Sequence, residues 1–191
     1  MFEEAGWSFD NDGLLTLITA NSNTLEHLDL DLPSIDFASI CAEFKNLKTL
    51  SLFPYISDTN ICNITNLIKQ APKLETLQGG QMNFELSKLS QFDKIVESLS
   101  LSRLKLGIMD AGALQAALII IRKTYKTLKS LDLVLENTSN MEDLLKHCQS
   151  VEFLRLEFCH GIQGLSSVPK PPEGKRKVSI STVQIVLIFR W

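Results

Sequence analysis

The sequence predicts an α/β fold in which about six similar units, each a helix followed by a short strand, stack side by side. Two observations predict it. A motif with the spacing Leu-x-x-Leu-x-Leu recurs along the chain, and stretches with a helical spacing of apolar residues precede most of its copies. The copies begin at residues 25, 47, 74, 96, 128 and 151. Self-similarity at such a period is typical of solenoid proteins, whose units bury their apolar faces against their neighbours.

Each copy of the motif is expected to form a short strand, because apolar and other residues alternate within it. Successive strands would pair into a curved parallel sheet on the concave side, with the helices on the convex side. This is the architecture of a leucine-rich repeat solenoid. The third copy has Gly79 in place of its last leucine, and Gly79-Gly80 predicts a bulge there. The longest step, from residue 96 to residue 128, predicts one large repeat.

Amphipathic helices are predicted before most of the strands. Their apolar residues follow the i, i+3, i+4, i+7 spacing of one helix face, or a looser form of it. N-terminal caps support two of them, since Asp110 precedes one helix and Ser139 with Glu142 forms a capping box before another. The predicted helices cover Leu14 to Ile18, Phe37 to Phe44, Ile61 to Ile68, Leu114 to Ile121 and Met141 to Cys148.

The pattern ends near residue 164, so we assign residues 1–164 to the repeat domain and residues 165–191 to an atypical tail. In this tail Pro169-Lys-Pro-Pro indicates a stiff linker, and a basic run follows it. The stretch from Val178 to Phe189 is apolar and β-branched. Two interpretations stay open: it adds an edge strand that caps the sheet, or it is exposed and prone to aggregate. The irregular tail also leaves open that the chain is a fragment of a larger repeat protein.

Composition and charge narrow the classes of function. The chain has 191 residues, of which 45% are hydrophobic, enough for one domain with a sizeable core. Its net charge of -3 gives no overall basic field, so we expect neither nucleic acid nor a membrane as a partner. No apolar run approaches the ~18–20 residues of a membrane span.

Four widely spaced cysteines, and an acidic start without the basic region of a signal peptide, predict a reducing compartment. We therefore expect a cytoplasmic protein. A nuclear location is the alternative. The basic run at residues 175–177 is short for a nuclear signal, and a solvated linker is the favoured interpretation of it.

The sixth copy carries the most specific motif. One cysteine closes its helix, three strand aliphatics follow, and a second cysteine precedes an isoleucine. These positions are Cys148, Val151, Leu154, Leu156, Cys159 and Ile162. The motif resembles the cysteine-containing leucine-rich repeats of F-box/LRR proteins, which are of the ribonuclease-inhibitor-like type. The loop Ile108-Met-Asp110-Ala-Gly112 is similar to a loop of the same family, whereas Ala71 stands where that family has a cysteine.

The resemblance implies a protein-interaction module that recognises substrates for a ubiquitin ligase. No F-box-like segment is present, and residues 1–12 are too short to hold one. Contact with cullin-ligase components would therefore run through another chain. The alternative is a regulatory or scaffold repeat protein unrelated to ubiquitination.

The residues that alternate with the leucines are assigned to the concave face. We expect a protein partner to bind there with Phe53, Phe153 and Arg155 as anchors, because aromatic residues and arginine dominate binding hot spots. Ordinary strand residues without a partner are the alternative. The candidate partner-binding residues are His27, Asp29, Thr49, Ser51, Phe53, Thr76, Ser98, Ser100, Asp132, Phe153, Arg155 and Glu157. Asp31, Gln78, Ser102, Ser130 and Val134 fall in the same register.

No constellation of residues predicts catalysis, a metal or a cofactor. His147-Cys148 and Cys159-His160 invite comparison with a zinc site, but Cys-x-x-Cys spacing is absent and packing explains both cysteines better. A cysteine nucleophile would need a base and an orienting group close in space, not only in sequence. The Gly-Gly pair of the third copy lacks the Lys-Ser/Thr of a phosphate-binding loop. We therefore expect a non-catalytic protein that holds no cofactor.

Overall fold

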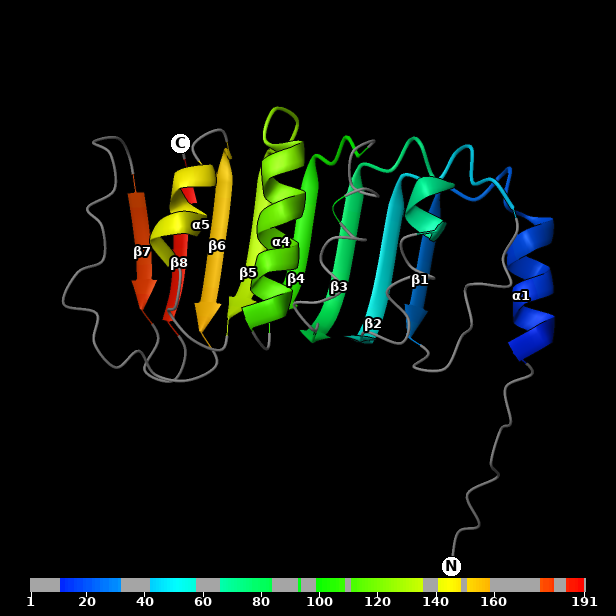
Figure 1. Cartoon of the computed structure of the whole chain (residues 1–191), viewed down its shortest axis with the longest axis horizontal. Coiled ribbons are helices and arrows are strands. Elements are labelled where there is room, and N and C mark those ends of the chain that lie inside the picture. The colour runs from blue at the N-terminus through cyan, green and yellow to red at the C-terminus, as the bar shows by residue number, and fades with distance from the viewer. Residues whose placement is uncertain are drawn as a thin grey trace, which may run out of the picture.

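An eight-stranded sheet runs across the width of the molecule (Figure 1). The structure is a computed structural model, and it describes residues 11–31, 42–57, 66–83, 93, 99–108, 111–135, 141–148, 151–158, 176–180 and 185–190. The strands lie in the order β1-β2-β3-β4-β5-β6-β8-β7. From β1 to β6, the order of the strands in the sheet is their order in the sequence, so each unit adds one strand to the sheet.

The first six strands pair in parallel. They are β1 His27–Asp31, β2 Thr49–Ser57, β3 Thr76–Asn83, β4 Arg103–Ile108, β5 Ser130–Leu135 and β6 Phe153–Phe158. Parallel neighbours need a crossover between them, which explains the long segment that precedes each strand. The expected α/β fold with a parallel sheet is confirmed.

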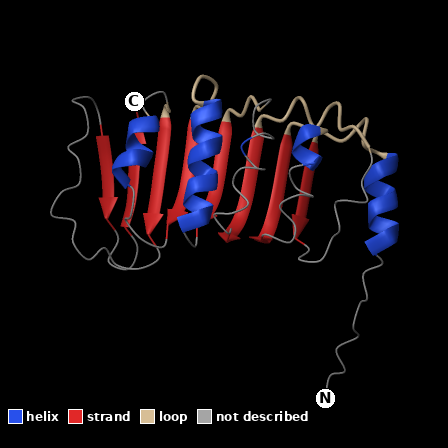
Figure 2. Ribbon diagram, in the orientation of Figure 1, coloured by secondary structure: helices blue, strands red, loops and turns tan. Residues whose placement is uncertain are grey.

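Three helices are described in full, and two of them lie against one face of the sheet (Figure 2). These two are α4 Ala111–Thr124 and α5 Met141–His147, and α4 contacts β3, β4 and α5. Helix α1 Asn11–Ala20 lies beyond β1, at the end of the sheet. We call the face under α4 and α5 the helix face and the opposite one the open face. Among the described residues, the open face carries no helix (Figures 1 and 2).

The predicted helices are confirmed where the structure describes them in full, at Leu14 to Ile18, Leu114 to Ile121 and Met141 to His147. Of the predicted helix from residue 61 to residue 68, residues 66–68 are described and are helical. Residues 42–44, the described end of the remaining predicted helix, are not helical. The rest of that helix, and the caps expected at Asp110 and Ser139, lie outside the described residues. No described helix has the length and apolarity needed to cross a membrane.

The fourth strand lies in a different place from the one that the sequence pattern predicted. The prediction put it at Val96-Leu99-Leu101, but β4 begins at Arg103, and its Leu104 and Leu106 are each 1% exposed. The chain contains a second, overlapping match, Leu101-x-x-Leu104-x-Leu106. Pairing with the neighbouring strands selects this match, because it brings the leucines of β4 into line with those of β3 and β5.

The corrected start changes the spacing of the units. Copies now begin at residues 74, 101 and 128, which are two equal steps of 27 residues. The large repeat predicted between residues 96 and 128 is therefore wrong. Its apparent length came from starting the fourth copy too early.

Backbone hydrogen bonds at the starts of β2, β3, β4 and β5 hold successive units in register. One carbonyl oxygen accepts from two successive N–H groups of the next unit. Glu26 O accepts from Lys48 N at 2.8 Å and Thr49 N at 3.1 Å. The same pattern recurs at the starts of β3, β4 and β5, where Glu75 O, for example, accepts from Ser102 N at 2.8 Å and from Arg103 N at 3.0 Å. A slip of one residue would break these bonds and turn every leucine toward the open face.

The core lies along the helix face of the sheet, and α1, α4 and α5 each contribute buried residues to it. Paired residues such as Leu104, Leu131 and Leu154 form rows across the strands, and each is at most 1% exposed. Helix α4 is buried on nearly all sides, which is typical of a helix that is apolar all round. Alanines at three of its buried positions let the helix approach the sheet closely. Burying one leucine side chain contributes roughly 1.5–3 kcal/mol, so these rows supply the main stabilising term.

Strand β3 is irregular, as the Gly79-Gly80 pair predicted. Its pairing with β4 shifts between Gln78 and Gln81, and the pairing of β2 with β3 shifts between Leu52 and Tyr55. Glycine at this point has no side chain to fill the leucine row and allows the extra residue of a bulge.

The tail continues the sheet with a change of direction. Strand β8 Ile185–Arg190 pairs antiparallel with β6, and β7 Arg176–Ile180 pairs antiparallel with β8 at the edge. Of the two interpretations left open by the sequence, the structure shows the one in which the tail extends the sheet. It adds two strands where one was expected.

Substitution of the buried leucines of β4 tests its register. We expect Leu104→Ala to lower the free energy of unfolding by about 2–5 kcal/mol, because it leaves a cavity in the core. The neighbouring substitution Lys105→Ala removes an exposed side chain and should change stability by less than about 0.5 kcal/mol. Urea unfolding followed by circular dichroism measures both. Equal losses for the two variants would contradict the register.

Candidate functional site

The candidate site is the open face, where the residues between the leucines point. Strand pairing arranges them in rows that cross the sheet. One row contains His27, Thr49, Thr76, Arg103, Ser130 and Phe153. The next contains Asp29, Ser51, Gln78, Lys105, Asp132 and Arg155. Neighbours in a row lie on adjacent strands, which are about 4.8 Å apart, so the face presents its side chains on a fixed grid.

Most of the predicted site residues lie on this face. His27, Asp29, Thr49, Thr76, Asp132, Phe153, Arg155 and Glu157 do so with their side chains exposed or half-buried. Ser51 is on the same face but only 6% exposed, so it offers little surface to a partner. Phe53 lies in β2 and pairs with Asp31, but both side chains lie outside the described residues.

Three serines assigned to this face do not belong to β4. Ser100 and Ser102 precede the strand, and the Ser102 hydroxyl donates to the backbone oxygen of Glu75 at 3.2 Å. Ser98 lies outside the described residues. The physical reason is the register of β4, whose leucine motif starts at residue 101, five residues later than the predicted start at residue 96.

Two cations stand where the serines were expected. Arg103 and Lys105 are exposed on the open face of β4. No hydrogen bond or ion pair joins either side chain to the described part of the chain. Arg103 has the neutral Thr76 and Ser130 beside it, and Lys105 has Gln78 on one side. The sequence contained the signal, since the second Leu-x-x-Leu-x-Leu match places both cations between its leucines.

A cluster of three charged residues forms the surface of β5 and β6. Arg155 donates from Nη1 to Asp132 Oδ2 at 3.1 Å and from Nη2 to Glu157 Oε2 at 2.8 Å. The side chains are 33%, 18% and 14% exposed for Arg155, Asp132 and Glu157. The guanidinium is thus held in place by two carboxylates. The other oxygen of Asp132, Oδ1, is buried and accepts no hydrogen bond from the described residues.

This cluster limits the role that Arg155 can play as an anchor. Two of its five N–H donors are already used within the protein. A partner would meet an ordered guanidinium plane and would not have to immobilise a free side chain, which lowers the entropic cost of contact. Phe153, half-buried in the same strand, is the aromatic residue of this part of the open face.

Charged side chains of different units also pair at the edge where the strands begin. Lys48 Nζ donates to Glu26 Oε2 at 2.7 Å. This hydrogen bond, with the attraction between the two charges, lowers the pKa of Glu26 and raises the pKa of Lys48. Both side chains are exposed, so the pair joins neighbouring units at the surface and contributes little to stability.

His147 is held between the two helices. Its Nε2 accepts from Arg122 Nε at 3.0 Å, and the same guanidinium donates to Asp143 Oδ2 at 3.0 Å. One of the two ring nitrogens through which a histidine can bind a metal is therefore occupied by a donor. Among the described residues, no three His, Cys, Asp or Glu side chains are grouped so that they could hold a metal ion.

Cys148 follows α5 and is 1% exposed. Burial raises the pKa of its thiol to about 12, because the thiolate would lose its hydration. The thiol is therefore neutral at physiological pH, whereas a cysteine nucleophile reacts as the thiolate. This supports the interpretation of Cys148 as a packing residue. Cys41, Cys62 and Cys159 lie outside the described residues.

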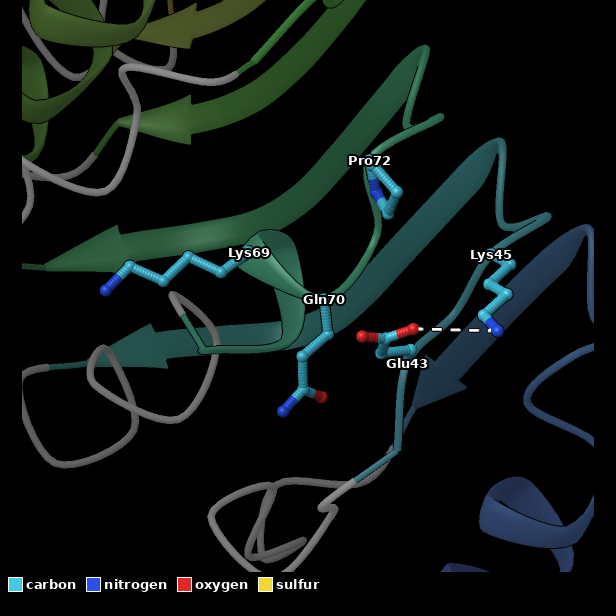
Figure 3. A pocket seen from close by; sticks show the side chains of 5 residues that line it. All are labelled: Glu43, Lys45, Lys69, Gln70 and Pro72. Atoms are coloured by element: carbon cyan, nitrogen blue, oxygen red, sulfur yellow. Dashed lines mark ion pairs between the residues drawn. The ribbon is translucent and has the colours of Figure 1, made fainter.

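A small hollow of about 220 Å³ lies between the segments that precede β2 and β3. Glu43, Lys45, Lys69, Gln70 and Pro72 line it (Figure 3). Glu43 pairs with Lys45 at 3.7 Å, while Lys69 extends in a different direction. Its polar groups do not converge on one point, in contrast to the usual small-molecule site.

No family model matches this chain, and no curated protein matches it.

The burial of Cys148 predicts slow reaction with thiol reagents. We expect iodoacetamide at pH 8 to leave Cys148 largely unmodified in the native protein and to label it rapidly in urea, because pH 8 lies far below a pKa of about 12. Peptide mass spectrometry measures the rate at this residue alone. Native labelling as fast as labelling in urea would show that Cys148 is not buried.

Proposed function

We propose that this chain is a leucine-rich repeat module that binds a protein partner on its open face and has no catalytic role. One observation carries this proposal. A sheet whose leucines are buried on one side presents two rows of polar, charged and aromatic side chains on the other. Such a face is formed before binding, so little ordering entropy is lost when a partner docks.

The regular arrangement of the units supports a leucine-rich repeat architecture. Three successive copies start at equal steps of 27 residues, and their leucines line up across the strands. Each unit contributes one strand, and β2, β3, β4 and β5 share the same hydrogen-bond pattern at the strand start. Stacking of this kind is how a repeat that is too small to have its own core becomes stable.

We further propose that the module recognises a substrate for a ubiquitin ligase of the F-box/LRR type, with the F-box supplied by another chain. The support is the motif of the sixth copy. Leu154 and Leu156 are buried in β6, and Cys148 and Val151 are buried between α5 and β6, as packing residues of a repeat would be. A scaffold or inhibitor role outside ubiquitination is the competing outcome of the test below.

Affinity capture from cell extract tests both levels of this proposal. The matched variants are Phe153→Ala on the open face and Tyr125→Ala, which removes an exposed aromatic residue that follows α4. We expect Phe153→Ala to weaken capture of the main partner by about tenfold, as for an aromatic hot spot, and Tyr125→Ala to leave it unchanged.

The two levels can fail separately. Cullin-ligase subunits among the captured proteins would support the F-box/LRR role, and their absence from a capture that still depends on Phe153 would reject that role alone. Capture that is equally strong with Phe153→Ala and Tyr125→Ala would reject the open face as the binding site.

A further inference from the structure

Within the described residues, no hydrogen bond or ion pair uses the side chains of the two exposed cations of β4. Arg103 and Lys105 lie two residues apart on one strand and point to the same face, so their Cα atoms are about 6.6 Å apart. Neither side chain forms an ion pair within the part of the chain that the structure describes, and β4 is in the middle of the sheet. A pair of unused charges at the centre of a binding face is available to a partner.

The charges around this pair leave it locally positive. Asp132 lies beside Lys105 and belongs to the Arg155 cluster, and the one net negative charge of this cluster is outweighed by the two positive charges of Arg103 and Lys105. Glu157 is bound to the same guanidinium. The exposed carboxylate of Asp29 is three strands away, about 14 Å, beyond the screening length of about 8 Å at physiological salt.

We propose that the open face binds an extended acidic segment of a protein partner over β4, with two carboxylates in the pattern Asp/Glu-x-Asp/Glu on Arg103 and Lys105. This inference rests on the proposed function and specifies the chemistry of its partner. An extended segment that runs along β4 repeats its side chains at about the spacing of the two cations. The Arg103 guanidinium can hold one carboxylate through two parallel hydrogen bonds.

The surroundings of the cations suit the backbone of such a segment. Thr76 and Gln78 on one side, and Ser130 on the other, offer neutral groups that donate and accept hydrogen bonds. The next open-face position of β4 is Gly107, which has no side chain, so a partner backbone can approach the sheet there.

A nucleic acid fits this face less well than an acidic segment. Binding to a phosphate backbone uses a stripe of several lysines and arginines. Here the positive zone is one strand wide, and the Arg155 cluster beside it carries two carboxylates against one cation. A short acidic segment that runs along β4 needs a positive zone only one strand wide.

The test uses fluorescence anisotropy with the full chain and a labelled short peptide containing a single Glu-Ser-Glu. The comparison peptide has the same composition with its two glutamates far apart. We expect Arg103→Ala and Lys105→Ala each to weaken binding of the Glu-Ser-Glu peptide by about tenfold, the loss typical of one charged hydrogen bond. The control Lys146→Ala removes an exposed cation of α5 and should leave binding unchanged.

Equal affinity for the two peptides, or equal binding by Arg103→Ala and Lys146→Ala, would overturn the proposal. Tighter binding of a single-stranded RNA oligonucleotide of equal charge, lost in the same variants, would replace it with a nucleic-acid site. If the peptide fails while partner capture still depends on Phe153, the acidic segment is rejected and the open-face module stands. If both fail, the module itself is rejected.

Discussion

The burial of leucines in one shared register is the constraint on which the other features of the molecule depend. In each parallel strand, alternate leucines are buried in one shared core, and backbone bonds from one unit to the next oppose a slip. Because strand residues alternate in direction, burial of one set leaves the other set on the open face. The same interaction therefore stabilises the core and determines which side chains meet solvent.

The fold could be predicted from the sequence wherever leucines alternate clearly with other residues. The leucine motifs predicted the parallel strands β1, β2, β3, β5 and β6, and helical spacing predicted α4 and α5. For the tail, the sequence showed only an apolar, β-branched stretch. Strand β8 pairs antiparallel with β6, and β7 pairs antiparallel with β8, through contacts that the local sequence pattern does not encode.

The register of β4 could not be predicted from the sequence alone. Leu99 and Leu101 fit one version of the motif, while Leu104 and Leu106 fit another. Local alternation satisfies both, and only alignment with β3 and β5 decides between them. Because side chains alternate between the two faces with a period of two, a shift by an odd number of residues, here five, exchanges the residues assigned to the open face. The predicted row of serines is replaced by Arg103 and Lys105, and a neutral centre becomes a positive one.

The central claim is that β4 buries Leu104 and Leu106 and exposes Arg103 and Lys105. Its most direct test is the native labelling rate of single cysteines introduced as Arg103→Cys, Leu104→Cys, Lys105→Cys and Leu106→Cys, each followed by peptide mass spectrometry. The account predicts fast labelling at residues 103 and 105 and slow labelling at residues 104 and 106. Uniform rates along the four positions, or the opposite alternation, would contradict it.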